Sequence, residues 1–568
     1  MRKQYKGYIF TFLALAIVLV GIFSASFAFA KGQSRSGAAP SAQPATAPMV
    51  SMHTVDMSSV PAETAQSASQ PPRLMPFLTG ISPAVYAQRK AAAAHNKNAP
   101  VDAHPNPDTA TGGISTPGTT AKFQGMADSA SICPYFGGCQ PPDQALGASP
   151  NWVFQGVNTS FAVYNTTGTR QAGWPKNAQN FFGVPNPGSC DTHGPFLSDP
   201  RALYDPKDGR FWTAELQVEG AFGLNSCPFK TLYWIGVSQT NNPNGAWNIY
   251  AFNMALGTTN AADYTQFGFD QTAIYFSGNM FNKAGTAYEY AEAFAALKST
   301  MEAGMAVTAF GFLKFTANGV LVDTVQPVEN EASSGPGAGL LINSFNMNGD
   351  GTHDCFSTAC SGLVVWAIAN PGKSTTSATG VIVSTKKYIS PPNADEPGCT
   401  QCIETIDTRI TGTPAFQKGL ISFALETGVN NGSQVVPAIF WGQVKPTISG
   451  GKITGATISQ SAYFSFTGDR AASFGALMAT ASGNLLMVFD TMSSTLDPSI
   501  MYTTRLTTDP KGTFETPLFL KKGLVATGDS RWGDYEATSY DGSATNNTWF
   551  SSEYSNGDWA TFIGKVHF

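Results

Sequence analysis

The 568-residue chain carries 33 basic and 38 acidic side chains, a net charge of −5, and only 12% of its residues are charged. An acidic chain of low charge density offers no electrostatic reason to bind DNA, RNA or an anionic membrane surface. We therefore expect no nucleic-acid partner.

The N-terminus has the pattern of an export signal. Arg2, Lys3 and Lys6 precede an apolar run from Ile9 to Phe29, which ends in the small-x-small sequence Ala-Phe-Ala read by signal peptidase. We predict a signal peptide over residues 1–30 and a secreted protein, extracellular or periplasmic, whose net charge becomes −8 once these three positive charges are removed. The alternative is an uncleaved anchor, which would be the chain's only contact with a membrane.

Residues 31–122 are rich in Ala, Pro, Ser, Thr and Gly and show no sustained period. Such a segment buries too little apolar surface to offset the entropy of ordering it. We predict a disordered tether over 31–122, with at most a transient helix at 84–95.

Short apolar or alternating runs separated by turn residues begin at Phe123. Nine of them read as strands: NWVFQGV, FAVYN, RFWTAEL, TLYWIGVS, AIYFSGNMF, LVVWAIAN, AIFWGQV, LLMVFD and TWFSSEY. Helical periodicity occurs once in this part, at 288–304, and predicts one helix.

A weak internal repeat of about 60–80 residues runs through the same part of the chain. Polar patches lead into small or aromatic strands at 199–210, 263–273, 340–351, 404–412, 470–483 and 531–542. This order is typical of propeller blades, whose small-residue inner strand is followed by more apolar outer strands. We predict an all-β fold, a β-propeller of six or seven enlarged blades over 123–568, in which FAVYN and the C-terminal TFIGKVHF share the closing blade.

Eight cysteines lie after the predicted signal peptide, and an even number in an oxidising compartment indicates disulfides. Sequence proximity favours the pairs Cys133–Cys139, Cys190–Cys227, Cys355–Cys360 and Cys399–Cys402. The alternative is a zinc site built from the last four of these thiols.

One segment resembles the start of a calcium loop. In NMNGDGTHD, Asn346, Asn348 and Asp350 place oxygen ligands at alternate positions before a glycine, but Ser357 stands where a bidentate Glu belongs. An ordinary Asn/Asp/Gly-rich turn explains the same residues. We expect no cofactor, with calcium as the one ion to consider.

Two motifs resemble a known family. PPDQALGASPNWVFQGVNTSFAVYNTTG at 141–168 and RWGDYEATSYD near the C-terminus are similar to the opening and closing motifs of secreted bacterial β-propeller proteins, loosely grouped with sialidases and largely uncharacterised. The resemblance covers about 123–568. It implies a propeller fold but no particular reaction.

The fold places one set of polar residues where the inner strands begin. These residues are expected at the mouth of the central channel: Asp199, Arg201, Asp263, Glu404, Asp407, Arg531, Trp532, Asp534 and Tyr535. They predict a module that binds an extracellular or cell-surface ligand, with a polysaccharide as the leading candidate. An ion pair between Arg531 and Asp534 that merely closes the ring is the structural alternative.

The enzymatic alternative is a glycoside hydrolase with its carboxylates at this mouth. The sialidase resemblance implies an arginine grip from Arg201, Arg409, Arg470 or Arg531 and chemistry by Glu404, Glu536 or Tyr535. The Arg-Ile-Pro signature and the Ser-x-Asp-x-Gly-x-x-Trp boxes of sialidases are missing from the chain. Whether the protein is an enzyme is left open by the sequence.

Overall fold

The structure of the chain is a computed structural model. It describes residues 38–63, 76–107, 116–128, 140–331, 335–346, 355–528, 531–542 and 546–568. The predicted signal peptide and the Cys133–Cys139 pair lie outside these residues. Residues 39–568 form one compact unit.

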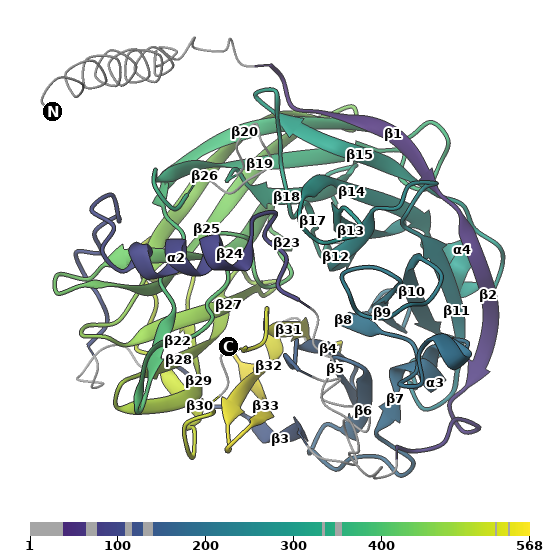
Figure 1. Cartoon of the computed structure of the whole chain (residues 1–568), viewed down its shortest axis with the longest axis horizontal. Coiled ribbons are helices and arrows are strands. Elements are labelled where there is room, and N and C mark those ends of the chain that lie inside the picture. The colour runs from purple at the N-terminus through teal and green to yellow at the C-terminus, as the bar shows by residue number, and fades with distance from the viewer. Residues whose placement is uncertain are drawn as a thin grey trace, which may run out of the picture. The chain divides into compact units, whose positions relative to one another are not determined.

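Seven antiparallel sheets surround a central axis as the blades of a β-propeller (Figure 1). The predicted fold class is thus confirmed, with seven blades. Each blade is given from its innermost strand outward. Blade 1 consists of β4 (Ala145–Ala148), β5 (Trp152–Val157), β6 (Ser160–Asn165) and β7 (Lys176–Asn177). Blade 2 consists of β8 (Leu197–Asp205), β9 (Arg210–Glu219), β10 (Lys230–Ser238), β11 (Ala246–Asn253) and β2 (Met49–Asp56), and blade 3 of β12 (Ala261–Phe269), β13 (Ala273–Phe281), β14 (Tyr288–Leu297), β15 (Ala309–Ala317) and β1 (Ser41–Ala47), with β16 (Val320–Leu321) paired to β15.

Blades 4 to 7 follow in chain order around the ring. Blade 4 consists of β17 (Gln326–Pro327), β18 (Gly339–Ser344), β19 (Cys360–Ala369) and β20 (Ser377–Tyr388), and blade 5 of β23 (Ala415–Gln417), β24 (Leu420–Asn430), β25 (Val435–Ser449) and β26 (Lys452–Phe464). Blade 6 consists of β27 (Ala471–Ala479), β28 (Leu485–Ser493), β29 (Leu496–Arg505) and β30 (Leu518–Lys521). Blade 7 consists of β31 (Ala537–Tyr540), β32 (Asn547–Ser555), β33 (Trp559–His567) and β3 (Ala121–Ala127). A separate hairpin pairs β21 (Ala394–Glu396) with β22 (Cys399–Ile403).

Apolar faces of neighbouring blades pack together and form the core. All nine predicted strand segments are strands, and their aromatic residues lie between the sheets, as Phe154 of blade 1 does against Trp247 of blade 2 at 5.4 Å between ring centroids. Inner strands such as β8 and β12 are buried along their whole length because blades flank them on both sides. A parallel bridge between Ala148 and Asp541 joins the first inner strand to the last and closes the ring.

The expected tether is the largest difference from the sequence prediction. Within the described part of 31–122, β1 and β2 add outer strands to blades 3 and 2, and α2 (Pro83–Ala93) packs on the ring (Figure 1). Disorder over this part is therefore wrong, and the domain begins at about residue 39 rather than 123. The physical reason is that backbone hydrogen bonds to an existing sheet edge order these strands without an apolar core of their own.

The predicted helix at 288–304 is also wrong for most of its length. Residues 288–297 form β14, and only α4 (Lys298–Glu302) is helical. The stretch is rich in Ala and Glu, which favour helices, but burial between β13 and β15 overrides that preference. Within the described ranges the remaining helices are short: α3 (Ala178–Phe182) and the 3₁₀ turn η1 (Gly188–Cys190).

The closing blade is built differently from the expectation. FAVYN belongs to β6 of blade 1, whereas the C-terminal β33 pairs with β3, which comes from the N-terminal side of the ring. The outermost strand of blade 7 therefore precedes blade 1 in sequence, so the two ends of the ring are joined by main-chain hydrogen bonds. Among the described residues, no helix is long and apolar enough to cross a membrane.

Candidate functional site

The loops that enter the inner strands bring acidic side chains from neighbouring blades together. Asp534 donates its backbone N–H to Asp143 at 2.6 Å, and the other carboxylate oxygen of Asp143 accepts from Asn158 at 3.0 Å. Asn158 in turn accepts from the backbone N–H of Asp199 at 2.9 Å, and Asp199 accepts from the N–H of Thr265 at 2.8 Å. This relay links blades 7, 1, 2 and 3 around the channel mouth.

Bulges in two inner strands set the directions of two side chains at the channel mouth. Inner strands β8 and β12 each contain a register shift, between Ser198 and Arg201 and between Asp263 and Gln266. Asp199 and Tyr264 in these bulges have left-handed backbone conformations, with φ of 59° and 51°. Such conformations cost free energy for side chains other than Gly and re-aim the residues that adopt them.

Burial dominates the electrostatics of these carboxyl groups. It raises the pKa values of Asp143, Asp199 and Asp263 above their usual range, and the nearby charge of Asp534 raises all three further. Asp534 itself keeps 14% of its side chain exposed. These carboxyl groups therefore hold their protons up to a higher pH than ordinary carboxylates do.

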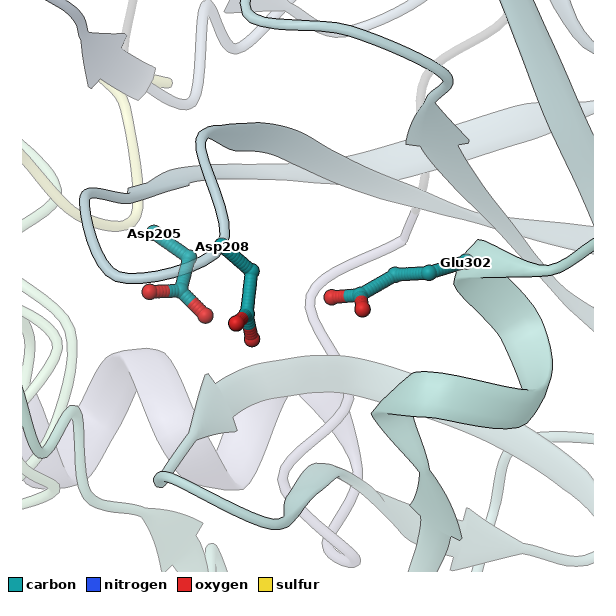
Figure 2. Close-up of side chains that lie close together, drawn as sticks. All are labelled: Asp205, Asp208 and Glu302. Atoms are coloured by element: carbon teal, nitrogen blue, oxygen red, sulfur yellow. The ribbon is translucent and has the colours of Figure 1, made fainter.

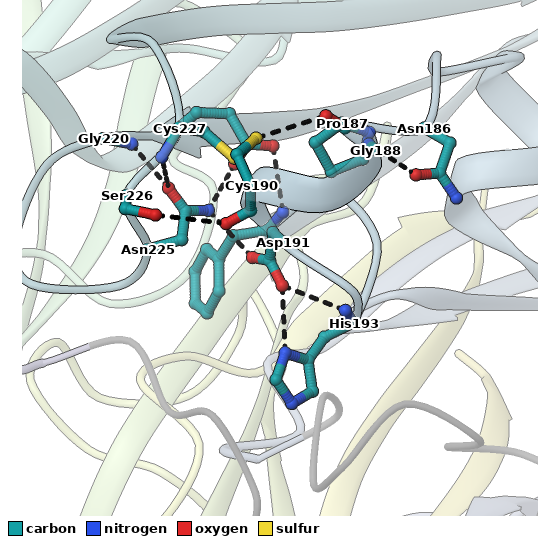
Figure 3. Close-up of a disulfide and its surroundings, with 12 residues drawn as sticks. Asn186, Pro187, Gly188, Cys190, Asp191, His193, Gly220, Asn225, Ser226 and Cys227 are labelled. Carbon is teal, nitrogen blue, oxygen red and sulfur yellow. Dashed lines mark hydrogen bonds and ion pairs between the residues drawn. A yellow bond between two sulfur atoms is a disulfide. The ribbon is translucent and has the colours of Figure 1, made fainter.

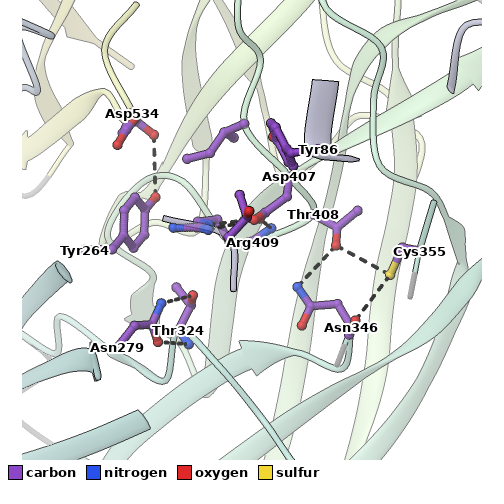
Figure 4. Close-up of polar contacts among 12 residues, drawn as sticks. Tyr86, Tyr264, Asn279, Thr324, Asn346, Cys355, Asp407, Thr408, Arg409 and Asp534 are labelled. Carbon is purple, nitrogen blue, oxygen red and sulfur yellow. Dashed lines mark hydrogen bonds and ion pairs between the residues drawn. The ribbon is translucent and has the colours of Figure 1, made fainter. Parts of the chain in front are cut away.

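The three arginines of the mouth are already engaged within the chain. Arg409 forms a bidentate pair with Asp407 at 2.9 and 2.6 Å, and its guanidinium lies 4.4 Å from the ring centroid of Tyr264 (Figure 4). Arg201 stacks 3.3 Å from the ring centroid of Tyr535 and donates to the carbonyl of Thr265 at 3.1 Å.

Arg531 and Asp534, from the RWGDY motif, form the predicted ion pair at 3.2 Å. Trp532 and Tyr535 are buried next to them, and the two side chains have different partners. The Trp532 indole donates to Asp490 at 2.6 Å, whereas the Tyr535 hydroxyl donates to the carbonyl of Pro200 at 3.0 Å. The motif thus joins blade 7 to blades 2 and 6.

A segment of the chain's own N-terminal part covers this site. The ring of Phe77 lies 5.5 Å from the guanidinium of Arg409 and 5.3 Å from that of Arg531, and Phe77 packs on Tyr86 of α2 at 5.2 Å. We call residues 76–95 the cap. Its helix begins at Ser82, whose hydroxyl accepts the Val85 N–H, followed by Pro83 at the first helical position.

Lys90 anchors the cap. Its ammonium group, only 2% exposed, donates to Thr405 at 2.9 Å and to the carbonyl of Ile406 at 2.6 Å, and lies 3.1 Å from Glu404. Tyr86 donates to the same carboxylate at 3.0 Å. Burial lowers the pKa of Lys90, and Glu404 opposes that shift.

The structure therefore unites most of the predicted mouth residues and adds others. Asp199, Arg201, Asp407, Arg409, Arg531, Asp534 and Tyr535 belong to connected contacts, and Glu404 joins them through the cap. Asp263 is linked to them only through the charges of Asp199, Arg409 and Asp534. Arg470 lies apart, stacked 4.2 Å from Phe466, and Glu536 points into a separate acidic cluster. Asp143, Tyr86 and Lys90 were missed, although the spacing of Tyr86, Lys90 and Ala93 on one helical face was a detectable signal.

Of the proposed calcium ligands, only Asn346 is described. Its amide donates to Thr408 at 3.2 Å, beside Cys355 (Figure 4). Asn348 and Asp350 lie outside the described residues, so the calcium loop stays a prediction.

Two of the predicted disulfides are confirmed, Cys190–Cys227 and Cys355–Cys360. Around the first, Asp191 accepts from the backbone and ring nitrogens of His193, both at 2.9 Å, and from Asn225 at 2.9 Å (Figure 3). Disulfides persist in oxidising compartments, so these two disulfides indicate a non-cytoplasmic protein.

The predicted Cys399–Cys402 bond is wrong, because both thiols are free. The two residues share β22, and their thiols lie in contact without being bonded to each other. Burial and contact with Cys399 raise the pKa of Cys402 to about 12. The four-thiolate zinc site is also excluded, because Cys355 and Cys360 are bonded to each other.

Two acidic clusters were not foreseen. Asp205, Asp208 and Glu302 converge at the far end of β8 (Figure 2), and Asp490, Glu536 and Glu553 converge between blades 6 and 7. In each cluster, one oxygen per residue lies within 4.8 Å of the others. Asp205 and Asp208 share the end of β8 and the turn after it, but Glu302 and the three members of the second cluster come from separate elements, so no sequence motif links either whole cluster.

Comparison with known proteins finds likenesses to solved structures at low identity only. No protein-family model matches the chain, and no curated protein matches it in sequence. Among solved structures it is similar to the Hadza microbial sialidase Hz136, at 9% identity and a TM-score of 0.34 over 73% of each chain. It is also similar to an ulvan lyase of polysaccharide lyase family PL25 at 12% identity, with a TM-score of 0.37 over 80% of this chain and 95% of that one. The extracellular domains 1–2 of Drosophila Semaphorin 1b match at 9% identity and a TM-score of 0.36, over 80% of this chain and 88% of the other. At these identities and scores, none of the three supports an activity for this chain.

Proposed function

We propose that the protein is a secreted β-propeller that acts as a binding module for an extracellular carbohydrate. The observation that favours binding over hydrolysis is that the polar side chains of the channel mouth are engaged with one another and with the cap. The arginines of the mouth are paired or stacked within the chain. The cap packs on two of them through Phe77 and is anchored beside them by Lys90, which binds the 404–406 segment. A hydrolase would need two carboxylates able to reach a glycosidic bond. Here the acids serve contacts between blades.

A surface cavity away from the mouth offers a better place for a ligand. It has a volume of about 330 Å³ and lies between residues 101–106 and the outer parts of blades 5 and 6. Its lining combines aromatic and polar side chains, including Asp102, His104, Lys386, Trp441, Tyr463 and Phe514. Aromatic surface with a few placed polar groups is the usual composition of a site for a small polar ligand, and sugars present both an apolar ring face and hydroxyl groups.

The cavity is bounded by ordered contacts. Segment 101–106 is held by parallel bridges from Val101 to Asn430 and from Asn106 to Phe466. The ring of Phe514 packs on Trp441 at 4.5 Å, and the Tyr463 hydroxyl donates to the carbonyl of Lys387 at 2.6 Å. A ligand would therefore meet side chains that are already positioned, which lowers the entropic cost of binding.

The test is a screen of the purified protein against polysaccharides and oligosaccharides that scores both binding and product release. We expect binding of at least one glycan without release of shorter products, and a fall in affinity of about tenfold or more in Tyr463→Ala. Tyr288→Ala is the matched control, because Tyr288 is also half-buried with its hydroxyl on a backbone carbonyl, at 2.6 Å, but lies in blade 3.

Two results would refute the proposal. Product release that is lost in Asp534→Asn would establish the hydrolase alternative at the channel mouth. Binding that is unchanged in both Tyr463→Ala and Phe514→Ala would place the ligand elsewhere.

A further inference from the structure

The RWGDYE sequence builds a buried acidic cluster at the interface of blades 6 and 7. Asp490 comes from β28, Glu536 directly precedes β31, and Glu553 comes from β32. Asp490 and Glu553 are fully buried, and Glu536 is 1% exposed. One carboxylate oxygen from each lies within 4.8 Å of the other two.

The residues around the cluster supply too few hydrogen-bond donors for its oxygens. Asp490 accepts from the Trp532 indole at 2.6 Å and from the Ser552 hydroxyl, and Glu553 accepts from the backbone N–H of Gly533. Among the described residues, neither oxygen of Glu536 nor the second oxygen of Glu553 accepts a well-formed hydrogen bond, and the polar side chains next to the Glu536 carboxyl are another acid, Asp490, and Ser552. Buried polar atoms are normally satisfied, so these three oxygens need an explanation.

Basic side chains of the described residues do not pair with these carboxylates. The ion pairs of the described residues leave all three carboxylates without a Lys or Arg partner. The cluster must therefore either hold protons or hold a cation from solution.

We propose that Asp490, Glu536 and Glu553 form a site for one divalent cation, with Ca²⁺ as the preferred ion. The ligand set is entirely carboxylate oxygen, which suits a hard cation and does not suit zinc or copper. Oxygens bound to Ca²⁺ at about 2.4 Å lie no more than roughly 5 Å apart, which matches the observed spacing. The oxygens of Glu536 and Glu553 that accept no well-formed hydrogen bond become ligands, and the bound ion joins blade 6 to the closing blade 7.

The experiment uses the full secreted chain, stripped with EDTA and then titrated with Ca²⁺, Mg²⁺ or Na⁺ separately. Calorimetry and elemental analysis measure stoichiometry, and thermal unfolding measures stabilisation. We expect one Ca²⁺ per chain, with a melting temperature that rises by more than about 3 °C at saturation. Glu536→Gln, which keeps the side-chain volume, should lose both effects.

Glu292→Gln is the matched control. Glu292 is also fully buried, has no hydrogen-bond partner for either oxygen among the described residues and has a pKa raised by burial, but it lies alone in β14. It should retain the full Ca²⁺ response, as should Asp208→Asn from the other acidic cluster. Failure of the wild-type protein to bind any divalent ion, or binding that survives in Glu536→Gln, would overturn the proposal.

A spectroscopic measurement keeps the test decisive if Glu536→Gln does not fold. Trp532 contacts the cluster directly, so Tb³⁺ bound there should show luminescence sensitised by tryptophan and displaced by Ca²⁺. Trp532→Phe should lose most of that emission while binding the same amount of Tb³⁺. Sensitised emission that is absent in the wild type, or unchanged in Trp532→Phe, would also overturn the proposal.

Discussion

The two acidic clusters contain the same kinds of side chain but differ in how their charge is balanced. At the end of β8, Lys298 lies 2.8 Å from Asp208 and also contacts Asp205, and its ammonium is 2% exposed (Figure 2 shows the three acids). At the interface of blades 6 and 7, Trp532, Ser552 and Gly533 donate hydrogen bonds, but no basic side chain of the described chain forms an ion pair with the acids.

This difference shows that a group of carboxylates is not by itself a metal site. Burial alone would lower the pKa of Lys298, but Asp205 and Asp208 raise it, so the lysine stays charged and neutralises much of its cluster. In the second cluster burial raises the pKa of every member. The first cluster is therefore a structural ion pair with a partly exposed third acid, and the second is the better candidate for binding an ion.

The largest effect is expected from Lys298→Met, which removes the cation but keeps an apolar side chain of similar length. It leaves Asp205 buried without its partner, and breaking a buried pair in this way costs about 3–5 kcal/mol. Urea denaturation at neutral pH measures the loss of unfolding free energy. Lys207→Met, at an exposed lysine nearby, is the control and should change stability by less than about 0.5 kcal/mol. Equal effects of the two variants would contradict a structural role for Lys298.

The second effect concerns the pH dependence of the protein in EDTA. The pKa of Asp490 is about 7 in the folded state, above the value of about 3.9 in the unfolded state. Between about pH 4 and pH 7 the folded state therefore keeps a proton on Asp490 that the unfolded state has lost. Its contribution to stability is present below pH 4 and lost as the pH rises through 7, by on the order of 2–4 kcal/mol. Asp490→Asn should therefore show a shallower decline in unfolding free energy between pH 4 and 8.

Asp208→Asn is the control for this pH series. Lys298 opposes the effect of burial on Asp208 and lowers its pKa, so this carboxylate cannot produce a decline toward alkaline pH. A wild-type protein whose stability is constant from pH 4 to 8 in EDTA would show that the second cluster carries no raised pKa.

Gly533→Ala should have an intermediate effect. A Cβ atom at this position would lie 2.7 Å from a carboxylate oxygen of Glu553, which is fully buried and cannot swing into solvent. Overpacking of this kind costs about 1–3 kcal/mol. Thermal unfolding should show the loss, and Ca²⁺ affinity should fall with it. Gly528→Ala would not serve as a control because Gly528 has a positive φ, whereas Gly118→Ala, with open space around it, should be nearly neutral.

The smallest effect is expected from Glu302→Gln in the first cluster. Glu302 is only partly buried, and Lys298 already balances Asp205 and Asp208, so we expect a change below about 0.5 kcal/mol in urea denaturation. A large change, or a Ca²⁺ response that disappears in this variant, would reverse the assignment of the two clusters.

The sequence by itself determined the fold class. Short apolar runs such as AIYFSGNMF specify strands through local alternation and β propensity. These features are local, because a few neighbouring residues decide strand and turn. The pairing of Cys190 with Cys227 also followed from proximity along the chain. The structure puts Asp199 and Asp263 in the inner strands of blades 2 and 3 and Asp534 just before that of blade 7, while their role in binding a ligand stays a prediction.

Only the tertiary structure decided what the N-terminal segment and the isolated acids do. β1, β2 and β3 are edge strands, and they are ordered by the backbone hydrogen bonds of blades 3, 2 and 7, whose partner strands lie far away in the chain. Likewise, Asp490, Glu536 and Glu553 meet because blades 6 and 7 pack face to face. Sequence patterns report local periodicity and composition. Edge pairing, capping and charge clustering depend on contacts between distant residues, which exist only once the ring has closed.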